Sequence, residues 1–159
     1  MTSSSVSSLR LLHSHKHVEF IKNSSLDTET IEYALTEHLR LSGMYWGLTA
    51  HKLLVMNKNN QEDKEDKEEE EEIMSKEDVM KFINECYDEK SSLFAGAPGH
   101  DGHLLYTLSA IQIFVLYECV QEQLSEERAK KICTAISKLQ SKEDGSFAGD
   151  EWGEVDTRF

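Results

Sequence analysis

The sequence predicts an all-α fold, and three observations support this prediction. Apolar residues recur at the three- and four-residue spacing of helices, and no segment alternates with the period of two that strands show. Pro98 is the one proline of the chain. Segments with a single apolar face alternate with segments that are apolar on every side, a pattern typical of helix pairs that stack into an α/α toroid or solenoid.

Size and charge limit the possible functions. A chain of 159 residues with 38% apolar residues is long enough for one domain with its own core. The formal net charge is −13, and no run of Lys or Arg offsets it, which disfavours binding to nucleic acid. The three cysteines form no C-x-x-C motif, which is typical of reduced cytoplasmic thiols, and no apolar run is long enough for a membrane span.

Residues 1–17 are rich in Ser and His, and we expect a flexible N-terminal tail. The segment is free of acids, as organelle transit peptides are, but it lacks their Arg-rich amphipathic face. His13, His15 and His17 could share a metal ion on an extended chain, although a solvated tail is the simpler interpretation. The domain proper is then expected over residues 18–159.

Two helices are expected before residue 57. The first begins at Asp27, a residue type that favours the N-cap, and continues with apolar residues spaced four apart. Ser42-Gly43 is expected to end it. Met44–Met56 is apolar over most of its circumference, which predicts a second and more buried helix.

Residues 57–72 contain almost no apolar side chains, and residues 62–72 hold nine acids and two lysines. A run of this composition cannot bury enough surface to become ordered, so we expect a disordered acidic insertion. Ser75 and Asp78 resemble a capping box and predict the start of a third helix with one apolar face.

Two further helices complete the pattern. Leu104–Val120 is apolar on every side and is expected to be surrounded by protein. Ser125, followed by two glutamates, predicts the N-cap of a fifth helix whose single apolar stripe runs from Ala129 to Leu139. The result is a partial toroid of about five helices in alternating inner and outer pairs.

An internal repeat emerges when residues 79–106 are placed over residues 132–159, a shift of 53 positions. Phe94-Ala95-Gly96 then falls on Phe147-Ala148-Gly149, and the apolar positions of the third helix fall on those of the fifth. Each unit is therefore an amphipathic helix, a Gly-containing turn and a more buried helix. The inner helices of such a stack wall a cavity, but periodicity alone names no ligand.

Aromatic side chains could line that cavity, because a long apolar ligand needs flat and rigid walls. Packing in the core is the simpler interpretation for each of them. The set comprises Tyr45, Trp46, Phe94, Tyr106, Phe114, Tyr117 and Phe147.

Polar residues stand where the inner helices begin. His100 and His103 have an H-x-x-H spacing that metal sites also use, but a loop in which Asp101 caps the helix and His103 binds backbone explains them more simply. Asp156 occupies the matching place in the second unit, and Arg158 beside it would support an anionic head group. The sequence holds no complete catalytic constellation, so we assign no catalytic residue and no metal ligand.

Three motifs run through the chain: LRLSGMYWGLTA (39–50), GHDGHLLYTLSAIQIFVLYE (99–118) and EDGSFAGDEWGEVDTRF (143–159). They resemble the β subunits of Rab (type II) geranylgeranyltransferases more than those of the farnesyl and type I enzymes. The resemblance covers about residue 16 to residue 159. It implies the all-α toroid that the repeat also predicts, a barrel that resembles that of the terpenoid cyclases.

The resemblance also implies a chemistry. Geranylgeranyl diphosphate would lie in an apolar tunnel, and its lipid would pass to C-terminal cysteines of Rab GTPases, with one zinc ion activating the thiol. The implied partners are a prenyltransferase α subunit and a Rab GTPase with its Rab escort protein, in the cytoplasm. Four residues match family positions that line or border the lipid site: Ser42, Trp46, Leu108 and Arg158.

The sequence departs from the family in ways that bear on activity. Ser91-Ser92 replaces a Gly-Gly pair, and Gly102 replaces the proline of an H-D-P-H motif, which is expected to loosen that turn. The family's zinc ligands, a D-x-C motif and a distant His, are absent, so we expect these 159 residues to be inactive alone. The alternative hypothesis is a non-catalytic helical module that binds the α subunit. A third hypothesis, a terpene-cyclase-like toroid, would need a D-x-D-D type motif, and none of the expected helices contains one.

Overall fold

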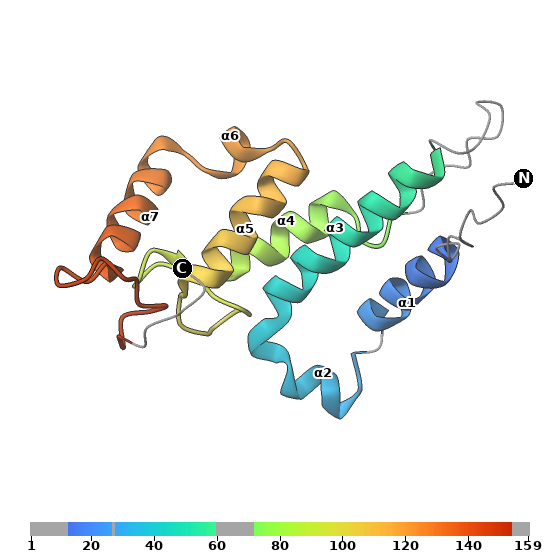
Figure 1. Ribbon diagram of the computed structural model, residues 1–159, viewed down its shortest axis with the longest axis horizontal. Coiled ribbons are helices and arrows are strands. Elements are labelled where there is room, and N and C mark those ends of the chain that lie inside the picture. Colours follow the sequence, from blue (N-terminus) through green and yellow to red (C-terminus); the bar gives the residue numbers. More distant parts are fainter. Residues whose placement is uncertain (1–12, 27, 60–71, 154–159) are drawn as a thin grey trace, which may run out of the picture.

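The computed structural model describes residues 13–26, 28–59 and 72–153, and most of them are helical (Figure 1). The all-α class that the sequence predicts is therefore confirmed. In chain order the elements are α1 (Ser14–Leu26), α2 (Ile31–Leu35), the 3-10 helix η1 (Glu37–Leu39), α3 (Arg40–Asn59), α4 (Lys76–Glu85), β1 (Tyr87–Asp88), β2 (Leu93–Phe94), α5 (Leu104–Leu116), α6 (Val120–Gln123) and α7 (Glu126–Leu139).

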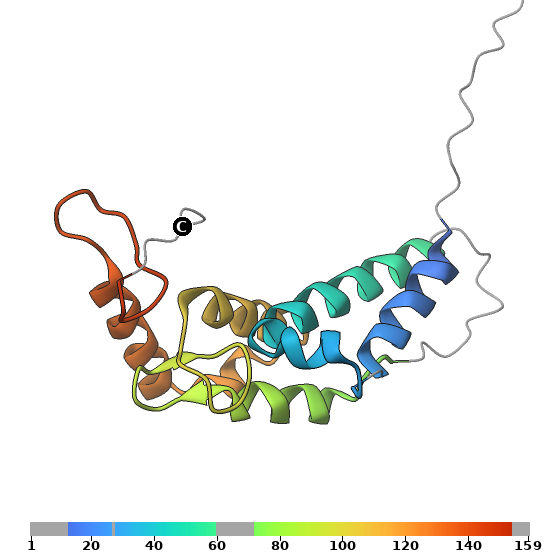
Figure 2. The same ribbon diagram turned by 90° about the horizontal axis from the view of Figure 1, so that it is seen from below.

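The core lies where α3, α4 and α5 meet. Figure 2 shows α4 along the lower edge of the molecule, with α3 and α5 lying above it. Each of the three helices contributes fully buried side chains, because each turns an apolar face toward the other two. The largest of these side chains are Leu41, Val79, Ile83, Ile113 and Phe114.

Local sequence determines where the two amphipathic helices begin. The Oγ atom of Ser75 accepts a hydrogen bond from the Asp78 N–H at 3.1 Å, and that of Ser125 accepts one from the Arg128 N–H at 3.2 Å. Both serines are the N-caps expected from the sequence, because a hydroxyl at this position satisfies an N–H that has no partner within the helix.

The internal repeat is confirmed in the hydrogen bonds of the backbone. Tyr87 pairs with Phe94 across β1 and β2, and Gln140 pairs with Phe147 in an isolated bridge. The Ala95 N–H donates to the Cys86 carbonyl at 2.8 Å, and the matching Ala148 N–H donates to the Leu139 carbonyl at 3.0 Å. Every partner in the second unit lies 53 positions after its counterpart in the first. The short antiparallel pair was not expected, because strands of two residues leave no periodic pattern.

Each turn is also tied to the inner helix that precedes it. The Leu41 N–H at the start of α3 donates to the Gly96 carbonyl at 2.8 Å, and the Leu104 N–H at the start of α5 donates to the Gly149 carbonyl at 2.7 Å. A Cβ atom at Gly96 would overlap the carbonyl oxygen of His38, so only glycine fits there. Gly96 thus allows a close approach of two backbones, whereas a Cβ at Gly149 would meet the ring of His103.

The N-terminal part differs most from the sequence-based expectations. Ser14–His17, expected in the flexible tail, form the start of α1, which packs on α3 near Gly47. Asp27 lies outside the described residues, and the N-cap of α2 is Thr30. Ser42-Gly43 does not end a helix, because both residues continue α3 from Arg40 onward.

Two boundaries of the more apolar helices were also wrong. Residues 57–59, expected in the acidic insertion, belong to α3, whereas residues 60–71 lie outside the described part of the chain. The helix expected over residues 104–120 ends at Leu116, and Glu118 adopts a positive φ of 53° before α6 begins. A positive φ is incompatible with a continuing right-handed helix, so the chain must change direction there.

No helix within the described ranges combines the length and the apolar character that crossing a membrane requires.

Candidate functional site

An apolar face runs along α3 and α5, and we call it the open face. Its members are Ser42, Trp46, Leu53 and Met56 on α3, together with Leu108 and Val115 on α5. All except Ser42 are exposed large apolar side chains, with Trp46 exposed by 65% and Leu108 by 42%. Their helical spacing places the four α3 residues on one side of α3 and the two α5 residues on one side of α5.

The exposure of α3 corrects one expectation. The all-round apolar segment Met44–Met56 was expected to be buried, but Leu48 is its one large side chain that is buried, with 9% of its surface exposed. Helix α5 covers one side of α3, and α1 covers another. On the remaining side of α3, the side chains of Trp46, Leu53 and Met56 are exposed to solvent. An exposed apolar stripe of this length is typical of a surface that binds another apolar group.

Hydrogen bonds beside the open face fix α5 against α3. The Gln112 Nε2 donates to the Tyr45 hydroxyl at 3.0 Å, and the Lys52 Nζ donates to the Leu116 carbonyl at 2.8 Å. The first bond satisfies the one strongly polar side chain in the middle of α5. The second satisfies a carbonyl at the C-terminal end of that helix, where the helix dipole also favours a positive charge.

The structure describes three of the four residues that the family resemblance implies for a lipid site. Ser42 and Trp46 lie four residues apart on α3, and Leu108 lies on the same face of the neighbouring helix α5. Arg158 is outside the described residues, as is Asp156. Sequence analysis missed Leu53, Met56 and Val115, although their spacing along the two helices would have placed them on the same face.

The predicted aromatic set divides between core and surface. Phe94 and Phe114 are fully buried and meet edge to face at 5.9 Å, which is core packing. The four partly buried members are Tyr45, Tyr106, Tyr117 and Phe147. Trp46 alone is strongly exposed, and it leans against the Tyr45 ring at 5.0 Å. Trp46 is therefore the aromatic side chain of the set most accessible to a ligand.

The histidines before α5 serve the backbone. The Nδ1 atom of His103 accepts a hydrogen bond from the Leu105 N–H at 3.0 Å, so His103, not Asp101, caps the helix. The His100 Nε2 lies 3.9 Å from the Glu37 carboxylate. Within the described ranges, no group of three His, Cys, Asp or Glu side chains is arranged to hold a metal ion.

The cysteines do not fit a zinc site either. Burial, with a smaller contribution from the Glu85 charge, raises the pKa of the Cys86 thiol to about 12, and burial also raises the pKa of Cys119. Both thiols are buried, and within the described residues neither belongs to a group of His, Cys, Asp or Glu side chains that could hold a metal ion. Cys133 is exposed on α7, and none of the three stands in a D-x-C motif.

Comparison with known proteins supports the same fold. The family described as "Prenyltransferase alpha-alpha toroid domain" matches residues 12–159. The chain is 43% identical over 152 residues to "Geranylgeranyl transferase type-2 subunit beta" of Saccharomyces cerevisiae, covering 96% of this chain and 42% of that protein. It is 37% identical to the protein of that name in Candida albicans, over 94% of this chain and 41% of the relative. The chain thus spans less than half the length of these relatives.

Proposed function

The chain belongs to the prenyltransferase alpha-alpha toroid family, and from this premise we propose that it forms the lipid-holding part of a Rab geranylgeranyltransferase β subunit. The relatives named as type-2 β subunits support the choice of enzyme. The observation that carries the proposal is the open face, where Trp46 and Leu108 project from adjacent helices.

The open face suits an isoprenoid for physical reasons. A geranylgeranyl chain is long and apolar, and burying apolar surface contributes about 25 cal/mol for each Å² removed from water. Trp46 offers a broad rigid surface, and Leu53, Met56 and Val115 extend the apolar stripe along both helices. The polar atoms of Tyr45 and Gln112 bind each other and therefore need no partner from the lipid.

In the proposed reaction, the lipid passes from its diphosphate to C-terminal cysteines of a Rab GTPase. The proposed partners are a prenyltransferase α subunit and a Rab GTPase presented by an escort protein, in the cytoplasm; the word "subunit" in the relatives' names supports an assembly. This family implies a zinc ion that activates the acceptor thiol. Because the described residues do not fit such a site, we assign this part of the chain to holding the lipid and derive no step through the metal.

The role of Ser42 follows from its size. It lies on the open face one helical turn before Trp46, and its small side chain leaves room beside the indole ring. We propose that this room accommodates the lipid chain. Arg158 is proposed to approach the diphosphate, because an Arg guanidinium pairs with phosphate oxygens in a bidentate fashion.

Binding of a fluorescent geranylgeranyl diphosphate analogue tests the proposal. Trp46→Ala and Leu108→Ala are expected to weaken binding by about tenfold each, because each removes apolar contact of about 1.5–3 kcal/mol at full burial. Trp152→Ala is the matched control, since Trp152 is also highly exposed but lies on the loop after α7. Equal losses in all three variants, or none, would contradict the proposal.

A second measurement separates the proposal from a non-catalytic module. The chain and a prenyltransferase α subunit are mixed and passed over a sizing column with and without the lipid analogue. Co-elution with lipid bound at the open face supports the β-subunit function. Co-elution with the α subunit but without bound lipid would leave only the interaction module.

A further inference from the structure

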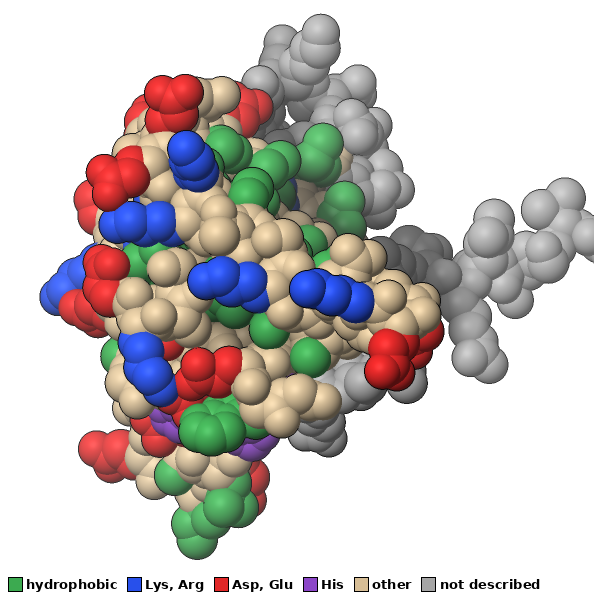
Figure 3. Space-filling view, turned by 90° about the vertical axis from the view of Figure 1, so that its left-hand side faces the viewer, with side chains coloured by type: hydrophobic (Ala, Val, Ile, Leu, Met, Phe, Trp, Pro, Cys, Tyr) green, Lys and Arg blue, Asp and Glu red, His purple; other side chains and the backbone are tan. Residues whose placement is uncertain are grey.

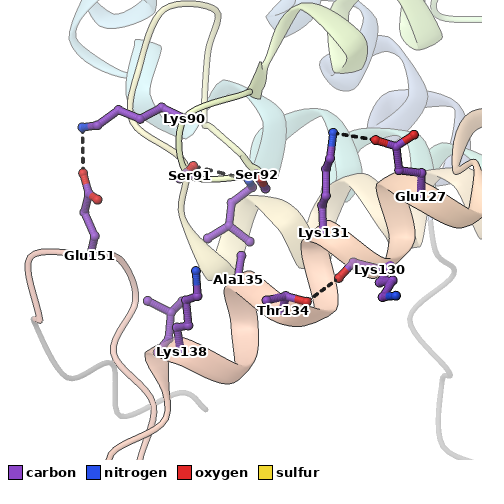
Figure 4. Close-up of a pocket in the computed structure, with 12 residues that line it drawn as sticks. Lys90, Ser91, Ser92, Glu127, Lys130, Lys131, Thr134, Ala135, Lys138 and Glu151 are labelled. Carbon is purple, nitrogen blue, oxygen red and sulfur yellow. Dashed lines mark hydrogen bonds and ion pairs between the residues drawn. The ribbon is translucent and has the colours of Figure 1, made fainter.

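A groove of about 480 Å³ lies between α7 and the turn that joins β1 to β2 (Figure 4). Its apolar lining includes Leu93, Ala135 and Leu139. Ser91 and Thr134 also line it, and their hydroxyl groups donate to the Asp88 carboxylate and to the Lys130 carbonyl. The volume falls within the range of ligand-binding pockets in proteins. The groove shares no residue with the open face, so the lipid site does not account for it.

Lysines dominate the charges around this groove, which we call the lysine groove. Four lysines and two glutamates line it, a formal surplus of two positive charges in a chain whose net charge is −13. The charged residues are Lys90, Lys130, Lys131, Lys138, Glu127 and Glu151. Figure 3, which views the molecule from the side where α7 lies, shows Lys and Arg side chains spread across this face.

The glutamates leave part of this positive charge available. Glu151 accepts a hydrogen bond from the Lys90 Nζ at 2.8 Å, and Glu127 lies 2.9 Å from the Lys131 Nζ. Both pairs are solvent-exposed, so each contributes little and can exchange its partner at low cost. Lys130 and Lys138 form no ion pair with any residue of the described ranges.

We propose that the lysine groove is a docking surface for an acidic segment of a partner protein. An apolar side chain of that segment would rest on Ala135 and Leu139, above the buried Leu93, and flanking carboxylates would bind Lys130 and Lys138. A peptide that binds there contacts the β1–β2 turn and α7 together, and so spans both repeat units. Nucleic acid is disfavoured as the occupant, because the net charge of the chain repels a phosphate backbone.

The acidic run of the chain itself is a poorer occupant than a partner. Residues 62–72 belong to the connection (60–75) between the end of α3 and the start of α4, and both helix ends lie at the end of the molecule away from α7 (Figure 1). A connection of this length must leave and return at that end. We therefore commit to a segment from another protein.

Fluorescence anisotropy with a labelled peptide tests the proposal on the full 159-residue chain. The probe is a decapeptide of glutamates with one central leucine, and its matched control carries glutamine in place of every glutamate. We expect the acidic probe to bind and the neutral one not to, with affinity falling as salt rises from about 0.05 to 0.5 M, because the contacts are exposed ion pairs. Binding of the neutral peptide with equal affinity overturns the proposal.

Variants locate the binding site. Lys130→Gln with Lys138→Gln is expected to weaken binding about fivefold, and the corresponding double change to Arg to retain it. Lys16→Gln with Lys81→Gln removes the same charge from exposed positions on α1 and α4 and should change affinity less than twofold. An equal loss of affinity in this control would mean that the net charge of the chain, not the lysine groove, determines binding, and would overturn the proposal.

The source of the acidic segment is tested in the same assay. Replacing residues 62–72 by a Gly/Ser sequence of equal length is expected to leave the affinity of the groove for the probe unchanged. A rise in affinity that the Lys130→Gln and Lys138→Gln double variant abolishes would mean that the chain's own acidic run competes for the groove, which overturns a partner as the occupant.

Discussion

The two Phe-Ala-Gly turns adopt the same backbone geometry in different surroundings. Ser92 has a φ of 61° and Gly145, 53 positions later, has a φ of 79°, and each donates its N–H to a carbonyl four residues earlier. Phe94 and Ala95 are nevertheless fully buried, whereas Phe147 and Ala148 are only partly buried. The comparison teaches that local sequence determines the turn, while burial depends on what packs against it.

The first prediction tests the difference in burial and has the largest expected effect. Phe94→Ala is expected to lower the free energy of unfolding by about 4 kcal/mol, because it opens a cavity between Tyr87 and Phe114. Phe147→Ala, the matched change in the second unit, should cost about half as much, since its ring is partly solvated. Urea unfolding followed by circular dichroism measures both, and equal losses would contradict the comparison.

The second prediction concerns the glycine of each turn, whose carbonyl accepts the hydrogen bond from an inner helix. Gly96→Ala forces a Cβ against the His38 backbone, and we expect a loss of about 3 kcal/mol because backbone cannot move aside cheaply. Gly149→Ala meets the ring of His103, which can rotate only by giving up its cap on the Leu105 N–H, so we expect a loss of about 1 kcal/mol. Thermal unfolding ranks the stabilities of the two variants. A larger loss of stability for Gly149→Ala would contradict the conclusion that the approach of backbones at Gly96 is the stricter constraint.

The third prediction sharpens the likeness between the turns. Ser92→Gly is expected to stabilise the chain by about 1 kcal/mol, because glycine adopts a positive φ without the strain that serine bears. Gly145→Ser introduces the strain in the second unit and should destabilise by a similar amount. Destabilisation by Ser92→Gly would mean that the serine hydroxyl has a role that the turn geometry does not reveal.

The fourth prediction compares the aspartates of the turns and has the smallest expected effect. Burial alone would raise the pKa of Asp88, but hydrogen bonds from Ser91 and from the Lys90 N–H outweigh it and hold that pKa below its usual value. Hydrogen bonds from Ser146 lower the pKa of Asp144. A lowered pKa in the folded state adds stability above the ordinary pKa near 4, and this stability is lost as pH falls through the folded value.

Acid unfolding measures this contribution. The free energy of unfolding should fall between about pH 5 and pH 2, and Asp88→Asn or Asp144→Asn should flatten the decline. Ser91→Ala and Ser146→Ala are matched changes that remove one donor to each carboxylate. An unchanged pH dependence in both aspartate variants would assign the decline to other carboxyl groups.

Sequence analysis succeeded where the determining contacts are local. The caps at Ser75 and Ser125 were predicted because a hydroxyl and the N–H three residues later lie within one turn of helix. The shift of 53 positions was found because both turns repeat the same short motif. All-α class and family membership followed from these features and from the three motifs.

Other features depend on neighbours that a local pattern does not contain. The α1 helix was missed because its Ser- and His-rich sequence has weak apolar periodicity, and its packing partner, near Gly47 on α3, is distant in the sequence. The exposure of Trp46 was missed because an all-round apolar helix gives no indication of which side remains uncovered. The lysine groove was missed because Lys90 and Lys138 are distant in the sequence and line one groove only when the β1–β2 turn lies beside α7.

The paired contacts Leu41–Gly96 and Leu104–Gly149 join backbone atoms alone. These two ties therefore do not depend on the exposed side chains of α3 and α5, Trp46 and Leu108 among them. Substitutions along the open face can then change its shape while both ties between turn and helix persist.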